Sequence, residues 1–214
     1  QGRHIEAEQA FKKALEFNPK NDLAYARLGR FYREQGRHIE AEQAFKKALE
    51  FNLKNYLAYM ELGWLYKDQK RYVESEQVFK EAIRFNPKPD SVYVALSWVY
   101  KEQGKLAEAE QILDKAVEIN SRYDPVYVGL GQVYHEQKRF TEAEQAFKKA
   151  IELNFKNDSA YVGLARVYGE MGKQEISKAY VKKTDKLRDK FYNPVTINNY
   201  HKLKQILDKR KIKL

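Results

Sequence analysis

The sequence repeats itself with a period of 34 residues, and this period limits the possible folds more than any other feature. Residues 1–18 recur letter for letter at 35–52, and residues 142–154 are a near copy of part of the same segment. A unit of this length cannot bury its apolar face alone, so the units must stack on one another. Three series of positions keep the spacing: Tyr25, Tyr59, Tyr93, Tyr127 and Tyr161; Leu28, Leu62, Leu96, Leu130 and Leu164; Tyr32, Tyr66, Tyr100, Tyr134 and Tyr168.

Within each unit the apolar positions have the spacing of one helix face. In the first full unit they form two sets: Tyr25, Leu28, Gly29 and Tyr32, then Ala41, Phe45, Ala48 and Leu49. Gly36 lies between the sets and is typical of a helix end, because glycine adopts the left-handed conformation at low cost. Asp22 opens the first helix, where a carboxylate can cap free N–H groups. The sequence therefore predicts pairs of helices, with Gly29 and its counterparts where neighbouring helices approach closely.

The composition agrees with an all-α chain. Hydrophobic residues make up 43% of the 214 residues, which is enough for a core and excludes disorder throughout. The absence of cysteine excludes disulfides, thiolate zinc sites and a cysteine nucleophile. Only 10 glycines and 5 prolines are present, too few for a turn-rich β fold. No apolar run approaches the roughly 20 residues that cross a bilayer, so we expect no membrane partner.

The repeated unit resembles the tetratricopeptide repeat (TPR). The family pattern is carried by Tyr25, Leu28, Gly29, Tyr32, Ala41, Phe45 and Ala48. The closing proline of the pattern survives only as Pro19 and Pro87, and Leu53, Ser121 and Phe155 replace it elsewhere. The resemblance implies a right-handed superhelical solenoid of antiparallel helix pairs, with the first helices on the concave wall and the second helices on the convex one.

The period and the resemblance divide the chain into three parts. We expect a second-helix remnant of a truncated repeat at 1–21, five units at 22–55, 56–89, 90–123, 124–157 and 158–190, and a basic helix or linker at 191–214. The fifth unit departs from the pattern and is predicted to serve as a cap, since terminal repeats are atypical. Gln1 reads as the middle of a repeat, so we expect a piece of a longer protein. Cytoplasmic location is then only the default assumption.

Most of the positive charge lies at the end of the chain. Residues 173–214 hold 13 Lys and Arg against 4 Asp and Glu, while the whole chain has a net charge of +10. Asn193 and Pro194 interrupt the helical pattern, and Thr196 can cap a further helix. Residues 192–214 more weakly resemble the junction that precedes an SGNH (GDSL-like) hydrolase domain in some repeat proteins. They carry no catalytic motif of that class.

The first helix of each unit also has an outward side. Residues offset by one or two positions from its core face, Ala26 among them, are expected to line the concave groove. The predicted partner-binding residues are Arg27, Arg30, Arg33, Met60, Trp64, Lys67, Val94, Trp98, Lys101, Val128, Gln132, His135 and Arg166.

The two tryptophans, Trp64 and Trp98, occupy equivalent positions one repeat apart. Two indole rings beside Met60 and Val94 would form an exposed apolar patch, which is typical of a contact site. The alternative is that each ring packs against the adjoining helix. If the rings bind a partner, replacing both with alanine should abolish partner capture and leave the melting transition almost unchanged.

No motif of catalysis, metal binding or cofactor binding is present. The chain has no glycine-rich phosphate loop and no His-Glu-x-x-His pair, and its histidines are scattered along the sequence. His135 has only Glu136 and Lys101 as expected neighbours, an ordinary solvated group. A basic tail could contact phosphates, but the body is nearly neutral and the tail lysines form no stripe. We therefore favour a protein partner over nucleic acid.

The sequence thus predicts a non-catalytic scaffold without cofactor or metal, which binds a protein or peptide in its concave groove. The Lys and Asn clamp by which some TPR proteins hold a peptide carboxylate is absent. An apolar or aromatic segment, with acidic residues for Arg27, Arg30 or Arg33, suits the groove better. The alternatives are a self-assembly module, which would form homo-oligomers, or an accessory region of a larger SGNH-type hydrolase.

Overall fold

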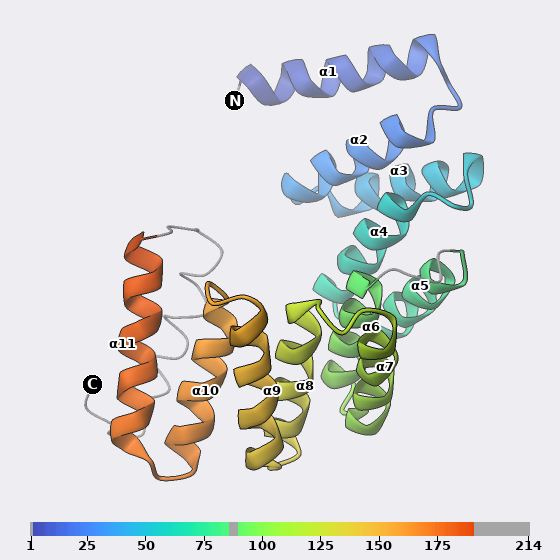
Figure 1. Ribbon diagram of the computed structural model, residues 1–214. Helices are drawn as coiled ribbons and strands as arrows, with labels where there is room; N and C mark the ends of the chain where they lie inside the picture. The colour runs from blue at the N-terminus through green and yellow to red at the C-terminus, as the bar shows by residue number, and fades with distance from the viewer. Residues whose placement is uncertain (1, 86–89, 191–214) are drawn as a thin grey trace. The chain divides into compact units, whose positions relative to one another are not determined.

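The computed structural model describes residues 2–85 and 90–190. The helix expected from Thr196 and the proposed hydrolase junction at 192–214 lie outside the described residues. The described part of the chain contains eleven α-helices and no strand (Figure 1). None of these helices is long and apolar enough to span a membrane.

The helices follow one another along the chain as the predicted pairs, two in each repeat. They are α1 (Gly2–Phe17), α2 (Asp22–Glu34), α3 (His38–Phe51), α4 (Tyr56–Asp68), α5 (Tyr72–Phe85), α6 (Asp90–Glu102), α7 (Leu106–Ile119), α8 (Asp124–Glu136), α9 (Phe140–Leu153), α10 (Asp158–Glu170) and α11 (Gln174–Lys190). We call α2, α4, α6, α8 and α10 first helices, and we call α1, α3, α5, α7, α9 and α11 second helices. The all-α fold with helical pairs is therefore confirmed.

The chain divides into two compact units, an N-terminal unit of residues 1–105 and a C-terminal unit of residues 106–214. In the N-terminal unit each helix from α1 to α6 packs against the next, and the first helices also contact one another, α2 with α4 and α4 with α6. In the C-terminal unit α7 to α11 pack in the same way, and α8 contacts α10. The sequence gives no sign of this division, because the 34-residue period continues through residue 105.

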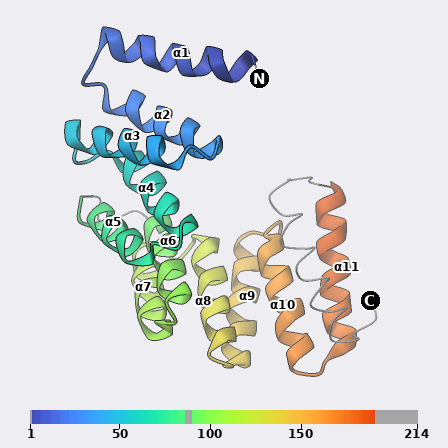
Figure 2. The same ribbon diagram turned by 180° about the vertical axis from the view of Figure 1, so that it is seen from behind.

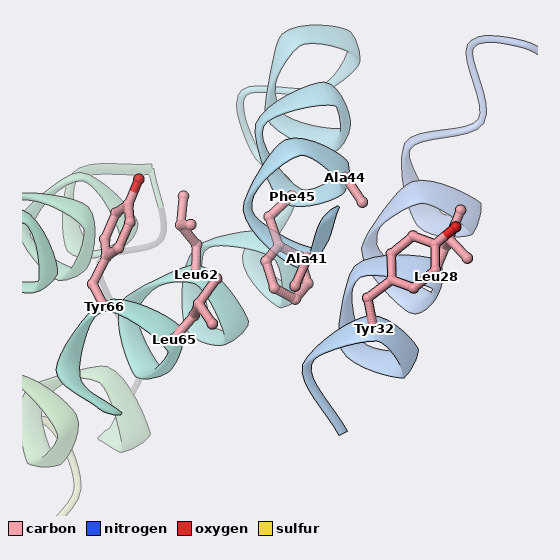
Figure 3. Close-up of a cluster of buried hydrophobic side chains, with 8 residues drawn as sticks. All are labelled: Leu28, Tyr32, Ala41, Ala44, Phe45, Leu62, Leu65 and Tyr66. Atoms are coloured by element: carbon pink, nitrogen blue, oxygen red, sulfur yellow. The ribbon is translucent and has the colours of Figure 1, made fainter. Parts of the chain in front are cut away.

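The core of the N-terminal unit lies between neighbouring helix pairs. Phe45 of α3 is fully buried and packs between Leu28 of α2 and Leu62 of α4 (Figure 3). Gly29 makes this arrangement possible, since a Cβ atom at that position would lie 2.6 Å from the Phe45 ring. The small residue predicted at the close approach is thus required by an aromatic side chain on the paired helix. The complete cluster is Leu28, Tyr32, Ala41, Ala44, Phe45, Leu62, Leu65 and Tyr66.

Asparagines cap three of the first helices, α2, α4 and α10, where the sequence predicted aspartates. The helix α8 begins after Tyr123 without a side-chain cap. The side chain of Asn21 accepts a hydrogen bond from the backbone N–H of Ala24 at 3.0 Å, and Asn55 does the same for Ala58 at 2.9 Å. The carboxylate of Asp22 instead accepts hydrogen bonds from the side chains of Asn52, at the end of α3, and Asn55, which caps α4. The cap preference of Asn and Asp is similar, so only the fold assigns one to the cap and the other to the link between repeats.

Glutamates on second helices link consecutive repeats. The carboxylate of Glu42 on α3 accepts hydrogen bonds from the hydroxyl of Tyr66 at 2.9 Å and from Arg71 at 2.7 Å. The Arg71 guanidinium in turn lies 4.1 Å from the centroid of the Tyr66 ring. Glu8 repeats the arrangement with Tyr32 and Arg37. These groups belong to successive repeats, so the interaction stabilises their stacking.

Candidate functional site

The two tryptophans lie on the first helices of the N-terminal unit, Trp64 on α4 and Trp98 on α6, and both are partly buried. The Trp64 ring meets the fully buried Phe79 edge-on, with ring centroids 5.6 Å apart and planes at 74°. The Trp64 ring therefore takes part in the core packing, while the residue as a whole remains partly exposed. The sequence left open whether the ring packs against the adjoining helix or forms part of an exposed patch. Trp64 packs on Phe79 and is also partly exposed.

Two lysines lie against these indole rings. The Lys67 Nζ atom is 5.6 Å from the centroid of Trp64 and 5.9 Å from that of Trp98. The Lys101 Nζ atom is 4.9 Å from the centroid of Trp98. We call these four residues the indole–lysine ladder. A cation over an indole is stabilised by roughly 0.5–1 kcal/mol at exposed sites. The Lys67 Nζ atom also lies 3.5 Å from Asp68 Oδ1 on the same helix, so part of its charge is compensated within the chain.

Arginines of α2 pair with a buried glutamate of α4. Glu61 is 8% exposed, and its Oε2 atom lies 3.1 Å from Arg33 Nη2. Its Oε1 atom lies 3.7 Å from Arg30 Nε, which also donates to Glu34 Oε1 at 3.0 Å. Two of the three arginines predicted to meet an acidic partner are thus already paired within the chain. Arg27 is exposed.

The remaining predicted residues of this unit, Met60 on α4 and Val94 on α6, are both partly buried. Ala26, expected in the same row, is fully buried with Ala48 and Ala58. Its position faces the contact between α2 and α4, and this contact leaves no surface there. The outward side of a first helix is therefore narrower than helical spacing alone suggests.

The same correction applies to Val128 in the C-terminal unit. Val128 is only 8% exposed and belongs to the core cluster that contains Phe147 and Leu164. The direct contact of α8 with α10 covers its side chain. Val128 therefore does not offer the surface for a partner that the sequence predicted.

His135 is not the solvated residue that the sequence predicted. Its side chain is 13% exposed, and its Nε2 atom lies 3.3 Å from Glu170 Oε1 on α10. Burial lowers the pKa of His135, and this effect outweighs the opposing attraction of the Glu170 carboxylate. Gln132 and Arg166, also predicted for the groove, are partly buried. The Nε atom of Arg166 is buried without a hydrogen-bond partner among the described residues.

The thirteen predicted residues thus belong to two units. Those from Arg27 to Lys101 lie in the N-terminal unit, and those from Val128 to Arg166 lie in the C-terminal unit. The indole–lysine ladder is the part of the list whose members contact one another, and we take it as the candidate site. The contacts of Lys67 with Trp64 and of Lys101 with Trp98 join residues three positions apart on one helix. Only the contact of Lys67 with Trp98 depends on packing α4 beside α6.

Over the described residues, no group of three or more His, Cys, Asp or Glu side chains is arranged to hold a metal ion. The ladder contains two indoles and two ammonium groups and lacks a carboxylate or imidazole that could transfer a proton. The side chains of the ladder are capable of apolar contact and of attraction to negative charge.

The family model of the tetratricopeptide repeat matches residues 32–97 and 100–166, and a second model with the same description matches residues 10–43. The chain therefore belongs to the tetratricopeptide repeat family. No curated protein matches the sequence.

Solved structures of TPR proteins share the fold at low sequence identity. A TPR protein of Parabacteroides merdae is 23% identical with a TM-score of 0.75, and the alignment covers 99% of this chain and 86% of that one. PilW, a type IV pilus biogenesis factor, is 20% identical with a TM-score of 0.75, covering 95% of this chain and 90% of its own. YrrB, described as a TPR protein with an unusual peptide-binding site, is 21% identical with a TM-score of 0.60, covering 86% and 95%. Proteins of this family are protein-interaction scaffolds and are typically non-catalytic.

Proposed function

We propose that the N-terminal unit binds a peptide segment that combines aromatic and acidic residues, and that the chain performs no reaction itself. The observation that carries this proposal is the position of Lys67 close to both Trp64 and Trp98. This arrangement presents apolar rings and positive charge together on the adjacent helices α4 and α6. A partner that complements both must supply an apolar group and a carboxylate.

The apolar part of the partner would contact the accessible portions of the two indoles. Partly exposed tryptophans on adjacent helices are costly to keep in water, and tryptophan with arginine is the composition favoured at binding hot spots. Met60 lies one turn before Trp64 on α4 and is also partly buried. A phenylalanine or leucine of the partner would therefore bury its own surface against side chains that the fold already holds in place.

The acidic part would contact the ammonium groups of the ladder and the exposed Arg27. Arg30 and Arg33 contribute less, because Glu61 already compensates their charge. Carboxylates opposite Lys67 and Lys101 would add to the contacts that both lysines make with the indoles. At Lys67 they would compete with Asp68, whose carboxylate lies 3.5 Å from the ammonium group. Such attraction weakens as the salt concentration rises.

The chain reports on this site through its own fluorescence, because its two tryptophans are both members of the ladder. The probe is a synthetic peptide with two phenylalanines among glutamates, titrated while tryptophan emission is recorded. We expect saturable binding that Lys67→Met weakens by about tenfold, equal to roughly 1.4 kcal/mol. Lys54→Met is the matched control, since Lys54 is exposed in the turn before α4.

Two further peptides decide between apolar and electrostatic recognition. Replacing the phenylalanines with alanine should weaken binding, and replacing the glutamates with lysine should abolish it.

Trp64→Phe is preferable to the double alanine variant, because Trp64 packs on Phe79 and its loss would disturb the core. The proposal fails if Lys67→Met and Lys54→Met bind the probe equally. It also fails if static light scattering shows that the emission change comes from self-association of the chain.

A further inference from the structure

Each first helix ends with an acidic residue at the same position of the repeat. These residues are Glu34, Asp68, Glu102, Glu136 and Glu170. The position carries glutamate in four repeats and aspartate only in α4. Within the N-terminal unit, α4 contacts both α2 and α6 (Figure 2), and it carries half of the indole–lysine ladder. The one residue that departs from the series is therefore at the candidate site.

Asp68 contacts two cations of different helices. Its Oδ1 atom lies 3.5 Å from Lys67 Nζ on α4, and its Oδ2 atom lies 4.0 Å from Arg33 Nη1 on α2. The equivalent Glu34 instead accepts a hydrogen bond at 3.0 Å from Arg30 of its own helix. Asp68 thus joins a lysine of the ladder to an arginine of the neighbouring first helix.

The contact between Asp68 and Lys67 is loose. Its 3.5 Å separation is longer than the about 2.7–2.9 Å of a strong hydrogen bond between opposite charges. The Asp68 side chain is 51% exposed, so water and salt screen its charge. A carboxylate that approaches from solvent can therefore take the place of Asp68 at the Lys67 ammonium group.

Arg33 provides a second cation for Asp68 after such an exchange. The two terminal nitrogens of Arg33 face different carboxylates, since Nη2 lies 3.1 Å from Glu61 while Nη1 faces Asp68. A guanidinium group has enough N–H donors to serve both. Asp68 can therefore leave Lys67 and keep a cationic neighbour, which lowers the cost of its displacement.

We propose that Asp68 is a specificity-determining residue of the ladder, which holds Lys67 in the free chain and moves to Arg33 when a carboxylate of the partner binds Lys67. The inference rests on the proposed function, because an acidic segment must reach Lys67. Asp68 lowers the affinity for acidic segments and leaves the affinity for uncharged apolar segments unchanged. The indoles thus recognise the apolar part of a partner, and Asp68 sets how much affinity the partner gains from its negative charge.

The probe is the peptide with two phenylalanines among glutamates, titrated while tryptophan emission is recorded. Asp68→Asn keeps the size of the side chain and removes its charge, and we expect about threefold to fivefold tighter binding, the range that the loss of an exposed ion pair allows. Glu102→Gln is the matched control, because Glu102 is exposed at the same repeat position in α6 and its loss changes the net charge equally. A probe with glutamines in place of the glutamates should bind all three chains alike.

A double-mutant cycle with Lys67→Met shows whether Asp68 acts through Lys67. Asp68→Asn should give no gain in the Lys67→Met chain, because the ammonium group that it releases is then missing. The inference is overturned if the gain persists in that chain, if Glu102→Gln gives the same gain, or if Asp68→Asn and the wild-type chain bind the acidic probe equally. Equal binding refutes the inference alone, whereas failure of both chains to bind the probe refutes the proposed function as well.

Discussion

The hydrogen bonds that Glu42 makes to the next repeat can be tested with the substitution Glu42→Gln. This substitution removes the negative charge of the side chain. Glu42 accepts hydrogen bonds from Tyr66, Arg71 and Lys46 at 2.9, 2.7 and 2.7 Å. Its side chain is 19% exposed. Glutamine keeps the size of the side chain but cannot replace the carboxylate as an acceptor for two cations and a hydroxyl.

The expected loss of stability follows from the pKa of Glu42. Burial by itself would raise this pKa, but the hydrogen bonds from Arg71, Lys46 and Tyr66 outweigh burial and lower it from 4.5 to about 2. At about 1.4 kcal/mol per pH unit, the upper limit is roughly 3.5 kcal/mol. Arg71 and Lys46 are 36% and 60% exposed, and solvent screens their charges. We therefore expect a loss of about 1–2 kcal/mol.

The sign of the pH dependence is determined by the same pKa. The pKa of Glu42 is lower in the folded state than in the unfolded state, so its carboxylate stabilises the fold above pH 4.5. This contribution disappears as the pH falls from 4.5 towards 2. The wild-type chain and Glu42→Gln should therefore differ in stability at pH 7 and become nearly equal near pH 2.

The assay is urea unfolding followed by circular dichroism at both pH values, with Glu50→Gln as the control. Glu50 lies on the same helix and is exposed, so its replacement should change stability little at either pH. Repeat arrays can unfold in parts, and hydrogen exchange in α3 and α4 should show that the loss is local. A difference below about 0.5 kcal/mol at pH 7 would refute the reasoning, as would one that persists undiminished near pH 2.

Three further outcomes are expected. Leu96→Ala should lower the free energy of unfolding by about 2–5 kcal/mol in urea titrations, because Leu96 is 1% exposed and its loss leaves a cavity; a smaller loss would mean that the core collapses into the space. Lys70 has a φ of 60°, where Gly104 at the equivalent position has 74°. Lys70→Gly should therefore increase the free energy of unfolding by up to about 1 kcal/mol and raise the melting temperature. An unchanged melting temperature would show that the left-handed turn is unstrained. Burial lowers the pKa of His135 from 6.5 despite Glu170, so protonation opposes folding and stability should fall as the pH drops below 6.5. His135→Gln should remove that part of the pH dependence in unfolding midpoints at pH 8 and 5.5, and identical profiles for both proteins would contradict it.

The helix pairs could be predicted from the sequence because their signals are local. Tyr25, Leu28 and Gly29 recur with helical spacing, and Gly36 adopts the positive φ of 72° typical of a helix end. Lys70 and Lys138 take the place of such glycines with φ of 60° and 62°, so the surrounding turn imposes the conformation even where the residue type does not favour it. The division of the chain into 34-residue units remains a prediction.

The candidate site could be predicted only in part. Helical spacing placed Trp64 and Trp98 on the outward side of first helices, where both are partly exposed. It could not show that Glu61 pairs with Arg33, or that Val128 is covered by the neighbouring first helix. Such contacts join residues of different repeats, and their distances depend on how closely the helices pack.

The sequence by itself determined where helices form and which face of each is apolar, because both depend on residues a few positions apart. The tertiary structure alone decided which of these faces are covered. The identical α1 and α3 show the difference, since Ala10 is exposed and Ala44 is buried. Burial is a property of the neighbours that a helix acquires, so the same residue of two identical segments is buried in one place and exposed in the other.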